Sequence, residues 1–174
     1  MKRLILFAAL VATFALSSIA EVQASDLEQN AAEAIALFKE TDPSLLEFFE
    51  SSYGYAIFPN VGKGGMGLGG AHGKGMVYRD GEIVGRTSLT QFTVGFQFGG
   101  QVYQQVIFFE NDRAYNDFTG GNFELSAQAS AIAAAAGVAA NAKYRHGVAI
   151  FTLGKGGLMY EASVGGQKFS FTPL

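Results

Sequence analysis

The fold of this chain is decided by a stretch near its middle, Gln91-Phe92-Thr93-Val94-Gly95-Phe96-Gln97-Phe98-Gly99-Gly100-Gln101. Apolar side chains occupy every second position from Phe92 to Phe98, and threonine, glycine and glutamine stand between them. Because successive side chains of an extended chain point to opposite faces, this alternation predicts a half-buried β-strand. We expect its aromatic face to pack on the core. Its glycine-rich face should admit another backbone or leave a groove.

Shorter strand-like runs surround this stretch. The expected strands cover residues 55–58, 75–79, 82–86, 102–109, 147–153, 158–164 and 168–172. Pro59 should end the first of them, because proline cannot donate to a ladder, and Asp80-Gly81 is typical of a tight hairpin turn. Residues 123–142 are rich in alanine, which favours a helix, but they begin with strand-like alternation. We expect a strand from Phe123 to about Ile132 and leave the remainder open.

Helical patterns precede the strands. Ser25 and Glu28 are spaced as a capping box, and the apolar positions that follow keep helical spacing as far as Phe38. Asp42-Pro43 predicts the start of a second helix, with Asp42 as its N-cap. Residues 113–118 form at most a short helical turn. The predicted fold class is α+β, with two N-terminal helices packed on an antiparallel, glycine-rich β-sheet that is curled into a sandwich or partial barrel.

The N-terminus has the pattern of an export signal. Positively charged residues precede an apolar run over residues 4–16, and small residues lead to Ala24. This pattern predicts a signal peptide over residues 1–24, with cleavage after Ala24. The expected product is a single domain, residues 25–174, that is periplasmic or secreted and peripherally membrane-associated. The sequence contains no cysteine, which excludes disulfides, thiolate metal sites, a thiol nucleophile and a cysteine-linked lipid anchor.

Charge and motif content argue against several classes of function. The chain has 12 Lys and Arg against 15 Asp and Glu, and residues 26–50 are strongly acidic. No basic block indicates nucleic-acid binding. The two histidines, His72 and His146, lie far apart in the sequence, and no hydrolase or zinc-protease motif is present. We therefore expect no enzyme, no catalytic residue, no metal site and no cofactor.

A repeated triplet indicates a possible anion site. Gly-Lys-Gly occurs at residues 62–64, 73–75 and 154–156, and Lys143, Arg145 and His146 form a further basic group. Glycines leave backbone N–H groups free to curl around an anion such as a phosphate, and the lysine supplies charge. The alternative interpretation is that these are ordinary turns whose lysines provide solubility and protect the edges of the sheet.

Two further motifs carry a family resemblance. Residues 54–65, Gly-Tyr-Ala-Ile-Phe-Pro-Asn-Val-Gly-Lys-Gly-Gly, and residues 93–101, Thr-Val-Gly-Phe-Gln-Phe-Gly-Gly-Gln, resemble the SYLF family, as do Gly73-x-Gly75 and Arg79-Asp80-Gly81. The likeness covers nearly all of residues 25–174. It implies a one-domain fold that binds phospholipid, with phosphoinositide binding in eukaryotic members and actin binding in fungal ones. Gly137-Val138 departs from the Gly-Pro of eukaryotic members.

The resemblance implies headgroup contact by Lys63, Lys74 and Arg79, which lie in the matching motifs. To these residues we add Lys143, Arg145 and Lys155, and we expect the aromatic rings of Tyr53, Tyr55 and Phe58 to enter a membrane interface. The predicted partner is an anionic phospholipid surface. One alternative is a structural or interaction protein of the cell envelope that binds a protein partner or a second copy. Another is a small outer-membrane barrel, which the shortness of the expected strands disfavours.

Overall fold

The computed structural model describes residues 25–66, 68–94, 100–121, 123–126, 129–155 and 164–174. The predicted signal peptide, residues 95–99 of the opening stretch and almost all of the expected strand 158–164 lie outside this part. Helix 25–41 comes first and is followed by α2 (Leu45–Ser51). The helix α3 (Asp112–Thr119) and a short 3-10 turn, η1 (Ala139–Asn141), come later in the chain. The fold is α+β, as the sequence predicts.

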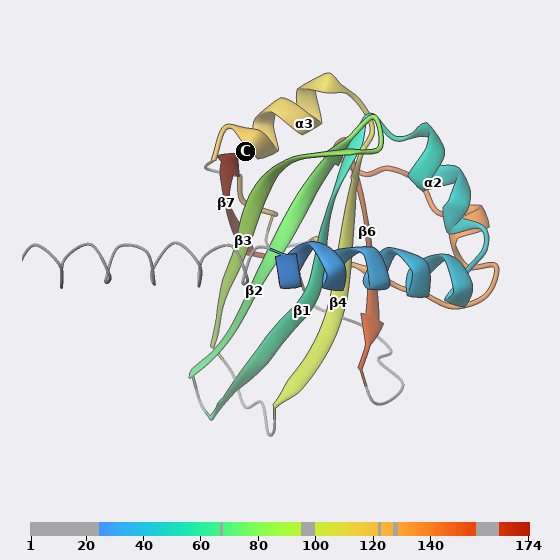
Figure 1. Ribbon diagram of the computed structural model, residues 1–174. Coiled ribbons are helices and arrows are strands. Elements are labelled where there is room, and N and C mark those ends of the chain that lie inside the picture. The colour runs from blue at the N-terminus through green and yellow to red at the C-terminus, as the bar shows by residue number, and fades with distance from the viewer. Residues whose placement is uncertain (1–24, 67, 95–99, 122, 127–128, 156–163) are drawn as a thin grey trace, which may run out of the picture.

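A seven-stranded sheet forms the body of the protein (Figure 1). In space the strands follow the order β5-β6-β4-β1-β2-β3-β7, so the sheet is open, with β5 and β7 at its two edges. Every pair of neighbouring strands is antiparallel except β5 and β6. The strands are β1 (Gly54–Met66), β2 (Leu68–Arg79), β3 (Glu82–Val94), β4 (Gln101–Phe109), β5 (Ile132–Ala133), β6 (Val148–Gly154) and β7 (Lys168–Pro173).

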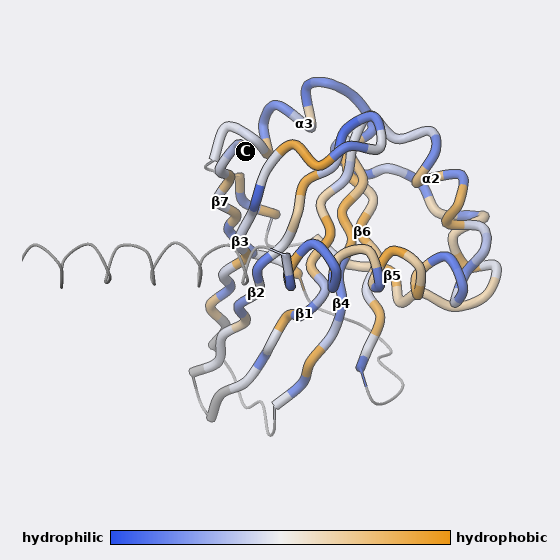
Figure 2. Tube along the Cα trace, in the orientation of Figure 1, coloured by the Kyte–Doolittle hydropathy of each residue, from blue (hydrophilic) through white to orange (hydrophobic). Residues whose placement is uncertain are grey.

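Each face of the sheet carries a separate hydrophobic cluster. On one face, which we call the helix face, Ile57, Met76 and Phe108 pack against helix 25–41 and α2 through residues such as Phe38 and Phe48. The other face, which we call the curled face, is covered by α3, by β7 and by the segment after α3. It contains the following buried residues: Ala56, Phe58, Val77, Leu89, Ile107, Phe109, Phe118, Leu125 and Phe169. Figure 2 shows that β4 and β6 are largely hydrophobic along their upper parts, where these layers meet them.

A polar cluster lies within the curled face. The side-chain amide of Gln105 donates to the amide oxygen of Gln167 at 2.8 Å, and the Gln167 amide donates to the Tyr103 hydroxyl at 3.2 Å. All three residues are fully buried. Burial raises the pKa of Tyr103 to about 12, although its bond to Gln167 acts in the opposite direction. These bonds satisfy polar groups that would otherwise be costly to bury.

The first strand is longer than predicted. Pro59 does not end it, because the register of β1 shifts between Ile57 and Asn60 and the strand continues to Met66. A bulge leaves a residue outside the ladder, so it accommodates a residue that has no N–H group to donate. Beyond the bulge, β1 continues beside β2 well below the helix that crosses the sheet (Figure 1).

The opening stretch folds differently from its pattern. Residues 82–86 and 91–94 belong to one strand, β3, which pairs with β2 and with the edge strand β7, so it is not central. Leu89 and Gln91 face the curled core, whereas Phe92 is 83% exposed. The predicted inward aromatic face is therefore wrong at Phe92. Burial of Leu89 determines which side chains of β3 face the core. The amide of Gln91 on the same side donates to the backbone oxygen of Gly165 at 2.9 Å.

Two other local predictions are corrected. Among its described residues, the alanine-rich segment forms a strand only at Ile132–Ala133, and its earlier part makes an isolated bridge between Glu124 and Lys168. The helix α2 begins at Leu45, after the N-cap Ser44, so Asp42 is not its N-cap. The Asp42 carboxylate is instead fully buried and accepts from the backbone N–H groups of Gly137 and Ala139, at 3.0 and 2.8 Å. Asp42 thus fixes a distant loop to the start of α2.

Candidate functional site

The helix face of the sheet is uncovered beyond Met76. Met76 and Tyr78 are buried, whereas the next residues on the same face of β2, Lys74 and His72, are exposed. Lys74 lies opposite Ser88 of β3. Arg86 is exposed two residues before Ser88, so its Cα atom is about 7–8 Å from that of Lys74, as for diagonal neighbours in a sheet.

The neighbouring strands add two more cations to this area. Lys168 of β7 lies opposite Thr90 of β3, which itself lies opposite His72. On the other side, the Lys155 ammonium donates to the side-chain oxygen of Asn60 at 2.6 Å, and Asn60 lies opposite Lys74. We call this surface the cationic face, and it is made of the following residues: His72, Lys74, Arg86, Lys155 and Lys168.

The strands of the cationic face carry little negative charge, and the nearest acidic element is helix 25–41, which packs on the same side of the sheet at Met76 and Tyr78. The described parts of β1, β2 and β7 contain no Asp or Glu, and β3 contains only Glu82, at the far hairpin end beside Arg79. Glu124 lies 3.5 Å from the Lys168 ammonium, with both side chains more than half exposed, so this pair is weak. The hydroxyls of Ser88 and Ser170, 2.6 Å apart, lie between the strands that carry these cations.

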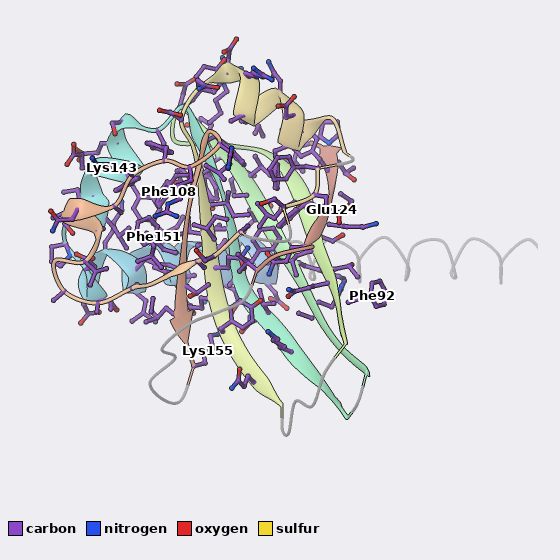
Figure 3. The ribbon with its side chains drawn as sticks, turned by 180° about the vertical axis from the view of Figure 1, so that it is seen from behind. Phe92, Phe108, Glu124, Lys143, Phe151 and Lys155 are labelled. Carbon is purple, nitrogen blue, oxygen red and sulfur yellow. The ribbon has the colours of Figure 1, made fainter. Side chains whose placement is uncertain are left out.

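Exposed apolar side chains continue the same surface toward the lower end of the sheet. Phe92 lies opposite Gly70, and Val102, which is 45% exposed, lies opposite Gly62. Figure 3 shows the Phe92 ring standing clear of the packed side chains, whereas Phe108 and Phe151 lie within them. The lower end of this surface therefore combines exposed apolar side chains with cations.

The structure brings together only some of the predicted headgroup residues. Lys74 and Lys155 meet at Asn60, but Lys63 follows Val61 on the curled face, beside Ala71. Partial burial lowers the pKa of the Lys63 ammonium. Arg79 ends β2 five residues beyond Lys74, about 17 Å away along the strand.

Arg79 has partners of its own at the hairpin end. Its guanidinium lies over the Tyr53 ring at 4.7 Å and the Tyr115 ring at 5.6 Å, and it contacts the carboxylate of Asp80 at 3.6 Å. Lys143 and Arg145 lie on the loop before β6, on the side of the sheet away from β7. The six predicted cations therefore do not form one cluster.

The predicted interface aromatics are corrected in the same way. Phe58 is fully buried and packs on Phe169 with ring centroids 5.6 Å apart, and Tyr55 is 9% exposed and stacks on Tyr78 at 4.9 Å. Neither ring is available to a membrane, because each fills part of a hydrophobic cluster. Tyr53 is partly buried under Arg79.

Sequence reasoning missed Arg86, Lys168 and Phe92. Counting outward from the Asp80-Gly81 turn along both strands places Arg86 near Lys74, provided that the register shift between Val77 and Tyr78 is known. Lys168 joins the face only because the C-terminal strand pairs with β3. Within the described ranges, none of the helices combines the length and the apolar character needed to cross a bilayer.

Comparison with known proteins adds two findings. Residues 90–172 match the Ysc84 family, described as "Las17-binding protein actin regulator". The chain is also similar to beta cell expansion factor A of Aeromonas veronii, with 31% identity over 137 residues, which is 78% of this chain and 51% of that protein. This chain thus spans about half the length of that relative. The family match over residues 90–172 includes Lys155 and Lys168 but not Lys74 or Arg86.

Proposed function

Because the chain belongs to the Ysc84 (SYLF) family, a family of binding domains, we propose that it docks on anionic phospholipid at a membrane surface through the cationic face. The observation that carries this proposal is the cross-strand register, which presents Lys74, Arg86 and Lys168 on one exposed side of a rigid sheet. Lys155 adjoins them through Asn60. The polar binding groups are side chains on paired strands, so little order has to be gained on docking.

The expected strength follows from the number of cations. A Lys or Arg near an anionic membrane surface contributes about 1 kcal/mol, and the attraction decays within a Debye length, about 10 Å at 0.1 M salt. The four Lys and Arg side chains of the cationic face would then provide about 4 kcal/mol, which gives weak, reversible and salt-sensitive binding. Phe92 would add contact with the interfacial region of the bilayer.

The compartment is part of the proposal. The charged start, apolar run and small residues up to Ala24 support export and cleavage before Ser25. The domain would then act as a peripheral protein on the outer side of the inner membrane or on the outer membrane. Mass spectrometry of the protein recovered from an osmotic-shock fraction tests this step. An N-terminus at Ser25 supports it, and recovery of the full-length chain from the cytoplasm contradicts it.

Vesicle co-sedimentation tests the docking itself. The protein is mixed with vesicles of phosphatidylglycerol and phosphatidylcholine, or of phosphatidylcholine alone, at several salt concentrations. The double variant Lys74→Gln/Lys168→Gln should bind anionic vesicles about 30-fold more weakly, the effect of losing about 2 kcal/mol. The matched control, Lys143→Gln/Arg145→Gln, removes the same charge elsewhere and should bind within about threefold of the unchanged protein. Equal pelleting with neutral and anionic vesicles contradicts the proposal.

A second candidate function is protein binding, which the description of the family as an actin regulator supports. The exposed Phe92 and Val102 would then contact a protein or a second copy of this chain. Light scattering of the purified protein and capture of partners from envelope extracts separate this function from the first. A stable dimer that is lost in Phe92→Ser, together with no vesicle binding, would favour it.

A further inference from the structure

A groove of about 1080 Å³ lies between two segments at the β6 side of the sheet. Its walls come from described residues of segments 123–132 and 141–150, and its apolar lining includes Leu125, Val148 and Ile150. These residues belong to the hydrophobic cluster of the curled face. Small-molecule sites usually enclose about 300–1000 Å³ and combine an apolar lining with a few polar groups, so the groove is large enough for an organic ligand.

Two cations stand on the rim of this groove. Lys143 and Arg145 are exposed and line it, and no ion pair of either is found in the described part of the chain. Glu124 is the only acid among the lining residues, and it lies against Lys168 at 3.5 Å. Among the described lining residues the rim is therefore net positive, and the lining below it mixes apolar side chains with the hydroxyls of Ser126 and Ser130.

The backbone around the rim is fixed. Arg145 and Val148 exchange backbone hydrogen bonds of 2.8 and 3.1 Å, and the two residues between them, His146 and Gly147, have φ values of 53° and 79°. Two successive positive φ values are typical of a type I′ turn, a tight two-residue turn with restricted backbone torsion angles. Further back, Asp42 holds the loop at Ala139. A rim that is already ordered loses little entropy when a ligand binds.

From this arrangement we propose that the groove binds a single-chain amphiphile with an anionic head, such as a fatty acid. The carboxylate is bound by Lys143 and Arg145, and the alkyl chain lies along the partly exposed apolar lining residues Phe123, Ala129 and Ile132. This site is separate from Lys74 and Arg86 of the cationic face, which lie beyond β4 and β1 in the sheet, and it does not depend on membrane docking. The charge of the rim and the apolar lining together select this class of ligand over a neutral lipid or a free phosphate.

Calorimetric titration tests the proposal with octanoate, decanoate and dodecanoate below their micelle concentrations. The expected result is saturable binding at one site, which tightens with chain length by at most about fourfold per buried methylene. The glycerol monoester of dodecanoic acid, which is neutral, should bind at least tenfold more weakly than dodecanoate. Absence of saturable binding, or equal affinity for the neutral ester, overturns the proposal.

Variants separate this groove from the cationic face. Lys143→Gln/Arg145→Gln should weaken dodecanoate binding at least tenfold, whereas Lys74→Gln/Arg86→Gln, which keeps the pair of Lys168 with the groove residue Glu124, should leave it unchanged. Ala129→Phe, which fills the groove, should abolish binding. The rim residues are exposed, so their double variant should keep its unfolding temperature and provides the test even if Ala129→Phe fails to fold. If dodecanoate binds the rim variant as tightly as the unchanged protein, the site assignment is wrong. Vesicle binding by the same variants is scored separately, so either proposal can fail alone.

Discussion

Replacement of Asp42 by alanine should destabilise the protein more than any change at an exposed acid. The Asp42 carboxylate is fully buried, and it accepts from Ser44 N–H and Oγ at 3.1 and 2.5 Å and from the backbone N–H groups of Gly137 and Ala139. Hydrogen bonds to a charged group contribute about 1.5–3 kcal/mol each. After the replacement, however, water can bond to the two Ser44 donors, because Ser44 is partly exposed. The N–H of buried Ala139 is left without a partner. We expect a loss of about 3 kcal/mol.

Urea unfolding followed by circular dichroism measures this loss. With a slope of about 2 kcal/mol per molar urea, the midpoint should fall by about 1.5 M. Asp42→Asn keeps one acceptor oxygen but turns an amide toward a donor, so it should lose about half as much. The control Asp117→Ala, at an exposed acid of α3, should change stability by less than about 0.5 kcal/mol. A change below 1 kcal/mol in Asp42→Ala would refute the role of this carboxylate.

The pH dependence of stability gives an independent check. Burial raises the pKa of Asp42, but the donors from Ser44, Ala139 and Gly137 outweigh it, and the pKa in the folded protein is lowered from 3.8. Because the folded pKa lies below the unfolded one, the stabilisation is present above about pH 4 and is lost as the pH falls through 3.8 toward the folded value. Asp42→Ala should therefore lose less stability on acidification than the unchanged protein.

Three further predictions concern the sheet. Gly75→Ala should cost about 1–3 kcal/mol of stability, because the new Cβ atom would meet a backbone oxygen of the neighbouring strand at 2.4 Å. Gly62→Ala should cost less than about 1 kcal/mol, because nothing lies within 4 Å of its Cβ position. Equal urea midpoints for the two variants would contradict this. Gln167→Leu should cost about 1–3 kcal/mol, because it leaves the buried Gln105 amide without its partner, and thermal unfolding would show the loss. Phe92→Ser should leave the unfolding temperature unchanged but weaken vesicle binding, and unchanged binding would exclude this ring from the interface.

The broad architecture follows from local patterns. Periodicity changes from helical to alternating after Ser52, and Asp80-Gly81 fixes the β2–β3 hairpin, where both residues have positive φ. These signals lie within a few residues of the structure that they specify. They were therefore sufficient for the α+β class and for the position of the hairpin.

The details that failed depend on distant partners. The choice of which side chains of β3 face the core depends on Leu89 and on a hydrogen bond from Gln91 to Gly165, which is 74 residues away in the chain. Pro59 is tolerated because the registers of β1 with β2 and with β4 both shift around it, which leaves Pro59 outside both ladders. Neither fact is visible in a window of residues around the position concerned.

The candidate site shows the same division. Glycine-lysine triplets drew attention to Lys74 and Lys155, and the fold places both next to Asn60, which accepts from Lys155 and lies opposite Lys74. Lys63 of the first triplet lies on the opposite face of the sheet. Successive side chains along a strand alternate between faces, and Lys63 is one position after Gly62, which lies opposite His72. Lys168 enters only through pairing of the C-terminal strand with β3. Two members of the proposed surface thus follow from sequence motifs, and the others follow only from the order and pairing of the strands.

The salt dependence of binding to anionic vesicles, measured for the unchanged protein and for Lys74→Gln/Lys168→Gln, tests the central claim most directly. We predict that binding of the unchanged protein weakens steeply between about 0.05 and 0.5 M salt, as the Debye length shortens, and that the double variant binds weakly with a shallower dependence. Binding that is insensitive to salt, or equal in the two proteins, would contradict docking through the cationic face.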